Sequence, residues 1–275
     1  MQFLKKLFRF YIFSNIHVAI GTFCLVKITL LTYGIPESNT ALFVLFSTIV
    51  AYNFIRFYRI SNIANWFSDW LKINKIVLYT LTLISVLIVV FLALSFQLKS
   101  FLWLLPFGVF TFFYGLPFPF KNIPLRNVAR IKLFLIAISF AGITVLFPLV
   151  QNNIEINLNV WLIFIQRFLF IVLITIPFDI RDLYVDSESL KTLPQMVGIK
   201  KTKVIGVLLG VLIVLLEFLK QPIESNQLII MLIVSIVSIL FLINSKEKQS
   251  KYYCAFWVES LPIFWFLLII LRINM

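Results

Sequence analysis

Charged residues are scarce in this sequence, and acidic residues are the scarcest. Only 13% of the 275 residues are charged, and 11 Asp and Glu stand against 24 Lys and Arg. Hydrophobic residues make up 61% of the chain, and its mean hydropathy is +1.03. About a quarter of the residues of an ordinary soluble domain are charged. The composition therefore excludes a soluble globular protein and predicts an integral membrane protein embedded in the lipid bilayer.

Cysteine and histidine are almost missing, with 2 Cys and 1 His. Cys24 and Cys254 lie far apart and lack the paired spacing of a zinc site, so we expect two buried, unpaired thiols. His17 follows Asn15 closely in the first apolar run. It could accept a proton from a substrate, but a packed, hydrogen-bonded histidine is the expectation.

Long apolar runs recur along the whole chain. A helix needs about 20 apolar residues to cross a hydrocarbon core of about 30 Å. The predicted spans are 14–33, 40–59, 76–96, 100–117, 129–150, 159–178, 202–219, 227–243 and 254–274. Residues before 14 predict an interfacial helix. The sequence thus predicts an all-α fold, a bundle of about nine transmembrane helices forming a single domain over residues 1–275.

Lys and Arg are distributed unevenly over the connections between these spans. If the N-terminus lies inside, 19 of the 24 fall on the inner side and three on the outer side, while Lys27 and Arg167 lie within spans. Inner loops of membrane proteins are enriched in Lys and Arg. The net charge of +13 therefore predicts a membrane orientation, with the N-terminus inside and the C-terminus outside, and no nucleic-acid partner. A cell (inner) membrane is the expected location.

Three carboxylates cluster in the stretch FDIRDLYVDSESLKTLPQMVGIKK, residues 178–201. If the sixth span continues as a helix, Asp179, Asp182 and Asp186 fall within an arc of about 60° on one face. Like charges this close repel one another and need a compensating cation. Three explanations remain open: a Mg²⁺ site, a solvated acidic turn, or ion pairs with nearby basic residues. Those residues are Arg181, Lys191, Lys200 and Lys201.

This stretch resembles the second aspartate motif of the UbiA-type intramembrane prenyltransferases. The family form is D-x-x-D-x-x-x-D, a short gap, [KR]-[ST] and a later glycine, and here Lys191-Thr192 and Gly198 follow the aspartates. The segment Tyr114 to Pro117, with the basic residues after it, is similar to the family's inner loop after the fourth span. The nine-span architecture is also the family's, so the resemblance covers the whole chain.

The resemblance implies transfer of an isoprenoid chain from a prenyl diphosphate to a lipophilic, often aromatic, acceptor, at a site that faces the cytoplasm. It implies Mg²⁺ held by Asp182 and Asp186 with Asp179 in support, and Tyr114 in the substrate pocket. The expected diphosphate contacts are Asn53, Arg56, Lys121, Arg126 and Lys191. It assigns no single residue as catalytic.

The sequence departs from the family at the first aspartate motif, N-D-x-x-D-x-x-x-D. Asn53 is present, but Phe54, Phe57 and Ser61 stand at the carboxylate positions, and Arg56 and Arg59 lie between them. Either an arginine grips the diphosphate in place of a metal ion, or the chain is a non-catalytic, UbiA-like protein that binds a lipid or quinone or serves as a scaffold.

A transporter is the third reading, because ionisable residues inside spans often mark a transport path. Its candidate residues are Lys27, Arg167 and Glu259, and the first and last of these could also form a structural ion pair. Phosphatidyl-type alcohol transferases are excluded, since the run D-G-x-x-A-R that they need is missing around the aspartates.

Overall fold

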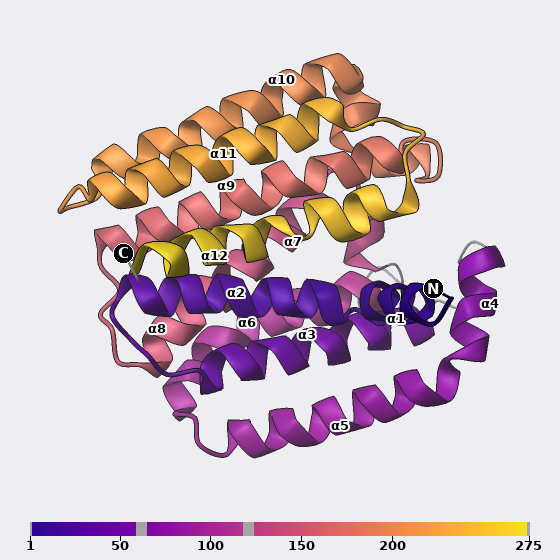
Figure 1. The fold of residues 1–275 in the computed structure, drawn as a ribbon, viewed down its shortest axis with the longest axis horizontal. Helices are drawn as coiled ribbons and strands as arrows, with labels where there is room; N and C mark the ends of the chain where they lie inside the picture. Colours follow the sequence, from indigo (N-terminus) through magenta and orange to yellow (C-terminus); the bar gives the residue numbers. More distant parts are fainter. Residues whose placement is uncertain (1, 59–64, 118–123, 274–275) are drawn as a thin grey trace.

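The computed structural model describes residues 2–58, 65–117 and 124–273. These residues form helices, and within them the only β-type pairing is an isolated bridge between Pro117 and Pro124. Most helices run parallel or antiparallel along the long axis of the molecule (Figure 1). The predicted all-α fold is confirmed for the described part of the chain.

The elements follow one another in a simple order along the chain. They are α1 (Gln2–Phe13), α2 (Ile16–Thr32), α3 (Asn39–Tyr58), α4 (Asn65–Ile73), α5 (Lys75–Ala93), α6 (Leu98–Gly115), η2 (Leu125–Asn127), α7 (Lys132–Ala141), η3 (Gly142–Leu146), α8 (Phe147–Gln151), α9 (Leu158–Arg181), η4 (Glu188–Leu190), α10 (Leu193–Leu215), η5 (Leu216–Leu219), α11 (Ser225–Asn244), η6 (Tyr253–Val258) and α12 (Leu261–Ile273).

Eight of the helical segments in the described residues are long and apolar enough to cross a membrane. In the numbering of the nine predicted spans, the fifth span (Lys132–Gln151) joins α7, η3 and α8, and the ninth (Tyr253–Arg272) joins η6 and α12. Helices α1 and α2 count as one more span, the first in chain order, if they are taken together across a bend of 56°. The chain is therefore a multi-pass membrane protein, as its composition predicts.

The outer surface of the bundle is apolar. On α5, for example, Leu87 is 62% and Phe91 72% exposed. Hydrocarbon offers no hydrogen-bond partners, so spanning segments satisfy their backbone groups within the helix and turn apolar side chains to lipid. The exposed leucine and phenylalanine side chains are thus the expected lipid contacts.

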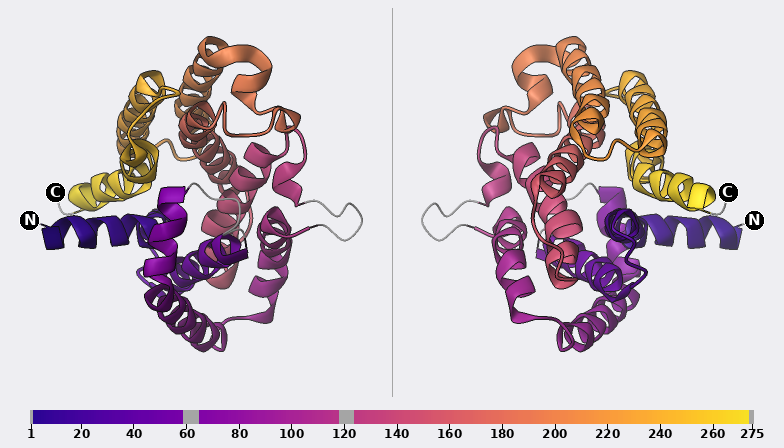
Figure 2. Two further views of the ribbon diagram at one scale, coloured as in Figure 1. Left: turned by 90° about the vertical axis from the view of Figure 1, so that its right-hand side faces the viewer. Right: turned by 90° about the vertical axis from the view of Figure 1, so that its left-hand side faces the viewer.

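Helix α1 projects sideways from the bundle (Figure 2). Phe3, Leu4 and Leu7 are exposed on it, whereas Ile12 and Phe13 are buried at its junction with the bundle. The chain bends at Asn15, which adopts a left-handed conformation with φ 69°. Lys5 and Lys6 are exposed on the same helix, and an amphipathic, basic helix of this kind is typical of a segment that lies on the membrane surface.

Helix α9 lies in the interior of the bundle and packs against α7, α10 and α11. Phe170, Leu173 and Ile176 of α9 are each no more than 1% exposed and belong to the largest hydrophobic cluster. Since α9 is central, its last turn carries Asp179 into the interior, where the aspartate is 2% exposed.

The seventh span begins earlier than the apolar run predicts, at Leu193 instead of residue 202. Gln195 accepts a hydrogen bond from the backbone N–H of Thr192 at 2.8 Å and so caps the first turn. Gly198 then interrupts the helix with φ 79° and ψ 160°, a conformation that only glycine adopts without strain. Lys200, Lys201 and Lys203 interrupt the apolar run after this first turn, which is why hydropathy places the start of the span later.

Substitution of Gly142 tests the packing between α6 and the fifth span. A Cβ atom at Gly142 would lie 2.3 Å from the ring of Phe107, so Gly142→Ala should force the ring to move. We expect a loss of about 1–3 kcal/mol, measured as a lower melting temperature of the purified protein in detergent. The matched change Gly108→Ala, on α6, meets no atom within 4 Å and should not lower it. Equal melting temperatures for the two variants would contradict this packing.

Candidate functional site

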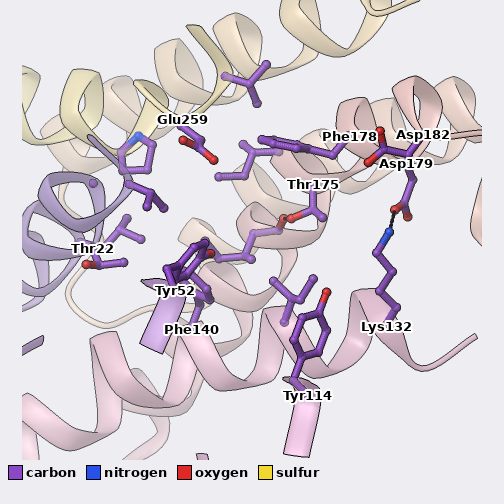
Figure 3. Close-up of a pocket in the computed structure, with 18 of the residues that line it drawn as sticks. Thr22, Tyr52, Tyr114, Lys132, Phe140, Thr175, Phe178, Asp179, Asp182 and Glu259 are labelled. Atoms are coloured by element: carbon purple, nitrogen blue, oxygen red, sulfur yellow. Dashed lines mark hydrogen bonds and ion pairs between the residues drawn. The ribbon is translucent and has the colours of Figure 1, made fainter. Parts of the chain in front are cut away.

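A cavity of about 310 Å³ opens between α2, α3, α6, α7, α9 and the last span. Five charged side chains line it, namely Lys132, Asp179, Asp182, Asp186 and Glu259. Figure 3 shows Glu259 across the cavity from Asp179 and Asp182, with Tyr114 and Lys132 on the α6–α7 side. The predicted convergence of the three aspartates is thus found, and Tyr114 lies with them.

The local structure around the aspartates differs from the predicted continuous helix. Helix α9 ends at Arg181, and Asp182 is its C-cap residue with φ −88° and ψ 8°. The backbone N–H of Asp186 still donates to the carbonyl of Asp182 at 2.8 Å. One turn therefore keeps Asp186 near the position that helical spacing assigns to it, although the helix itself has ended.

Lys132, the first residue of α7, joins two of the three aspartates. Its Nζ lies 3.1 Å from Oδ1 of Asp179 and 2.7 Å from Oδ2 of Asp186. The lysine side chain is 18% exposed and that of Asp179 only 2%. A buried carboxylate needs a partner of opposite charge, and a cation at the start of a helix is disfavoured by the helix dipole. Each charge therefore stabilises the other.

Asp182 has a cation partner of its own. Arg181 donates from Nε to Oδ1 and from Nη2 to Oδ2 of Asp182, both at 2.8 Å. This bidentate geometry is the strong form of an arginine–carboxylate pair. Both side chains remain partly exposed, at 33% and 24%. Of the basic partners that the sequence suggested, Arg181 pairs with the cluster, whereas Lys191, Lys200 and Lys201 form no ion pair with it in the described residues.

Glu259 is the acidic residue on the opposite wall. It follows the π-helical segment η6, and the neighbouring Val258 and Pro262 also line the cavity. Among the described residues, no lysine or arginine nitrogen lies within 4 Å of its carboxylate, although the charges of Arg56 and Arg181 act on it from farther away. Glu259 is thus a carboxylate without a direct ion pair inside a cavity.

Two of the expected diphosphate contacts are occupied elsewhere. Asn53 is 1% exposed, accepts a hydrogen bond from Asn15 at 2.7 Å and donates one to Thr82 at 3.0 Å. Arg56 donates to the carbonyl of Phe13 and lies 4.9 Å from the ring centroid of Phe67. These contacts tie α3 to α2, α5 and α4. Neither residue lines the cavity.

The remaining predicted contacts lie outside the cavity or outside the described residues. Lys191 is exposed, in a left-handed conformation with φ 47°, between η4 and α10. Lys121 is not among the described residues, and of Arg126 only the backbone, in η2, is described. Their roles toward a diphosphate remain predictions.

Other polar residues within spans separate clearly from the cavity. His17 contacts the hydroxyl of Tyr11 at 2.7 Å and the carbonyl of Phe256 at 3.0 Å, so it is packed and hydrogen-bonded as expected. Lys27 donates to the carbonyl of Glu37 at 2.8 Å, in the α2–α3 connection. It therefore does not form the structural ion pair with Glu259 that the sequence suggested.

Lys132, Glu259 and Tyr52 are the lining residues that the sequence does not single out as parts of the aspartate site. Lys132 counts only as one more inner basic residue, and Glu259 only as a rare acid within a span. Tyr52 lies beside Asn53 on α3 but lines the cavity, whereas Asn53 does not. Motif matching points to Asn53, and the rotation of α3 in the bundle brings its neighbour to the site instead.

The aspartates are the side chains that could hold a metal ion. Mg²⁺ binds through one or two carboxylates and completes its shell with water and substrate phosphates, and Asp182 and Asp186 could supply those oxygens. No cluster of three or more His, Cys, Asp or Glu arranged to hold a metal ion is found in the described residues. The carboxylates thus fit a metal that arrives with a phosphate ligand better than a ready-made metal cage.

Comparison of the chain with family models, with curated proteins and with solved structures finds no significant match. The likeness to a family therefore rests on the motif residues of the sequence alone.

The ion pair of Lys132 can be tested through stability. Lys132→Gln leaves the buried Asp179 without its cation, and breaking a buried pair costs about 3–5 kcal/mol. We expect a large drop in melting temperature in detergent, mostly recovered in the double variant Lys132→Gln/Asp179→Asn. Lys72→Gln, whose partner Asp69 is 70% exposed, is the control and should change little. An equal drop in the single and double variants would contradict the pairing.

Proposed function

We propose that this protein is a UbiA-type membrane prenyltransferase, which transfers an isoprenoid chain from a prenyl diphosphate to a lipophilic acceptor. The carrying observation is the cavity itself: three aspartates and Lys132 lie at one end, and apolar side chains line its depth. Ile171 lies eight residues before Asp179 on α9, about 12 Å farther along the helix. A polar head and an apolar tail fit these two parts.

The size of the cavity favours a short prenyl chain. Its volume of about 310 Å³ is at the lower end of the range of about 300–1,000 Å³ for small-molecule sites. Of the α9 residues that line the cavity, Ile171 is the farthest along the helix from the aspartates. Arg167 lies one turn beyond Ile171 and donates to the carbonyl of Leu25, another lining residue. The tail would lie along the facing sides of α2 and α9 up to this level.

The reaction breaks the bond between the allylic carbon and the diphosphate oxygen, and both electrons leave with the oxygen. An electron pair of the acceptor forms the new bond to that carbon, and the acceptor then loses a proton. Lys132 and Arg181 place positive charge near the leaving diphosphate. When bound to Asp182 and Asp186, Mg²⁺ would neutralise further charge on that group.

Aromatic side chains of the cavity would face the carbon skeleton of the prenyl chain. Phe178 lies between Glu259 and the aspartates, and Tyr52 and Phe140 line the cavity from the side of α3 and α7 (Figure 3). The face of an aromatic ring attracts a cation by about 0.5–2 kcal/mol, which favours positive charge on the allylic carbon here. Glu259, a carboxylate without a direct ion pair, is the proposed acceptor of the proton.

The orientation and location follow from charge. Most of the Lys and Arg lie in α1, in the connections after α3, α6, α9 and α11, and in the helix turns next to these connections. By the positive-inside rule, we place this end of the bundle, and the opening of the aspartate cavity, toward the cytoplasm. A cell (inner) membrane is the proposed location.

Asp182 gives the most direct test of this function. Membranes containing the protein are incubated with labelled prenyl diphosphates of several chain lengths, with and without Mg²⁺. We expect Mg²⁺-dependent transfer of label to a lipid-soluble product, reduced about a hundredfold or more in Asp182→Asn because charge stabilisation at the leaving group is lost.

The control is Glu188→Gln, which removes an exposed acid of the same connection that does not line the cavity. It should retain full activity. Transfer by the folded Asp182→Asn variant at the wild-type rate would overturn the proposal.

A second function, binding of a prenyl diphosphate or quinone without turnover, is favoured by one observation. Asn53 and Arg56 are held in packing contacts, and Lys132 already neutralises two aspartates. This function predicts saturable binding of a prenyl diphosphate by the purified protein, with no release of inorganic diphosphate above the Asp182→Asn background. Saturable, Mg²⁺-dependent release would exclude it.

A further inference from the structure

A second cavity, of about 190 Å³, lies at the opposite end of the bundle from the aspartates. The first half of α9 lines it, together with the second half of α2 and the connection between α10 and α11. Arg167 of α9 is one of its lining residues and lies twelve residues before Asp179, about 18 Å away along the helix. The two cavities share no lining residue.

Arg167 is the unusual residue of this cavity. Its side chain belongs to the largest fully buried ones and is 1% exposed, nine residues into a membrane-spanning helix. No carboxylate oxygen in the described residues lies within 4 Å of its guanidinium. An uncompensated charge at this depth is costly and points to a functional role.

The hydrogen bonds of Arg167 leave one edge of the guanidinium buried and without a partner. Nη1 donates to the carbonyl of Leu25 at 2.8 Å and to the hydroxyl of Thr144 at 3.2 Å, and Nη2 donates to Thr29 at 3.3 Å. Nε has no partner. A guanidinium carries five N–H donors, so two remain, on Nε and Nη2. These adjacent nitrogens form an edge that binds a carboxylate through two parallel hydrogen bonds.

The other charges of the cavity are already balanced. Glu217 accepts hydrogen bonds from Lys220 at 2.8 Å and from Nε2 of Gln166 at 2.7 Å. Burial lowers the pKa of Lys220, an effect that the Glu217 carboxylate opposes and the charge of Arg167 reinforces. Glu224 is an exposed acid at the rim. Among the described residues, Arg167 is therefore the buried charge of this cavity that has no ion pair, while Glu224 is left to the solvent-facing rim.

A second unpartnered atom lies beside Arg167. Gln166 is 1% exposed, and its Oε1 accepts no hydrogen bond while its Nε2 donates twice. A buried carbonyl oxygen without a donor is rare in folded proteins. Gln166 and Arg167 both line the cavity, and together they have one acceptor and two donors without a partner.

We propose that this second cavity binds a small organic carboxylate, whose two oxygens accept hydrogen bonds from Nε and Nη2 of Arg167. A hydroxyl or ammonium group of the same ligand would donate to Oε1 of Gln166. The cavity is smaller than most ligand sites, which limits the ligand to a few carbon atoms. The centroid of the Trp265 ring lies 4.9 Å from Cζ of Arg167. This ring, with Ile28 and Ile163, would contact the carbon skeleton of the ligand.

Quenching of Trp265 fluorescence tests this site in the full chain, reconstituted in discs of phosphatidylcholine. The probe is 3-bromopropanoate, because bromine quenches tryptophan on contact, and its neutral match is 3-bromopropanamide. We expect saturable quenching by the carboxylate alone, lost in Trp265→Phe, and weakened at least tenfold in apparent affinity in Arg167→Gln. In discs that also contain oleate, competition between oleate and the probe would show that the bound carboxylate can come from a fatty acid of the membrane.

A second variant, Thr32→Phe, is tested in case Arg167→Gln fails to fold. It leaves Arg167 in place and fills the cavity from α2. In the described residues the Thr32 hydroxyl donates only to the carbonyl of Ile28 in the same helix, so no contact between helices is lost. Thr32→Phe should also abolish the saturable quenching. Equal quenching by the amide, or unchanged quenching in Arg167→Gln and Thr32→Phe, would overturn the proposal. Activity of the aspartate cavity does not enter the measurement.

Discussion

Hydrocarbon offers no hydrogen-bond partner, and this constraint decides where the chain can keep a polar side chain. Asn53, Arg167 and Asp179 are buried in helices that face lipid elsewhere, and each is held by groups from other helices. Asn53 joins α3 to α2 and α5, Arg167 joins α9 to α2 and the η3 turn, and Lys132 joins α7 to the end of α9. Polar residues of this chain therefore act as cross-links between helices, and the two cavities form where such cross-links leave space.

Most of the fold can be predicted from the sequence because span length and charge distribution are local properties. The apolar runs place the spans to within a few residues, except where lysines interrupt the apolar run, as in the span that begins at Leu193. Spacing also brings Asp179, Asp182 and Asp186 together, although the reason is partly different: α9 ends at Arg181 and a turn completes the arrangement. The backbone hydrogen bond from Asp186 to Asp182 spans four residues, as in an α-helix. The prediction from helical spacing therefore holds although the helix has ended.

The rest of the candidate site depends on how helices rotate and pack, which spacing along one chain does not determine. Lys132 reaches Asp179 only because α7 packs against α9. On α3, rotation directs Tyr52 to the cavity and leaves Asn53 and Arg56 in contacts with α2, α4 and α5. Glu259 enters the cavity wall beyond the π-helical turn η6, where the helix phase shifts. These are tertiary facts, and the three residues that they bring to the cavity, Lys132, Tyr52 and Glu259, are ones that the motif match does not select.

The contacts of Arg167 bear on the electrical insulation of the membrane. The two cavities lie in line along the facing sides of α2 and α9, and a continuous channel through them would short-circuit the membrane potential. The guanidinium closes that line, since it is bonded across to Leu25 and Thr29 of α2 and stacked on Trp265. A fixed positive charge at a constriction repels protons and metal cations. The protein can thus hold two polar chambers inside one bundle and still insulate the membrane that it crosses.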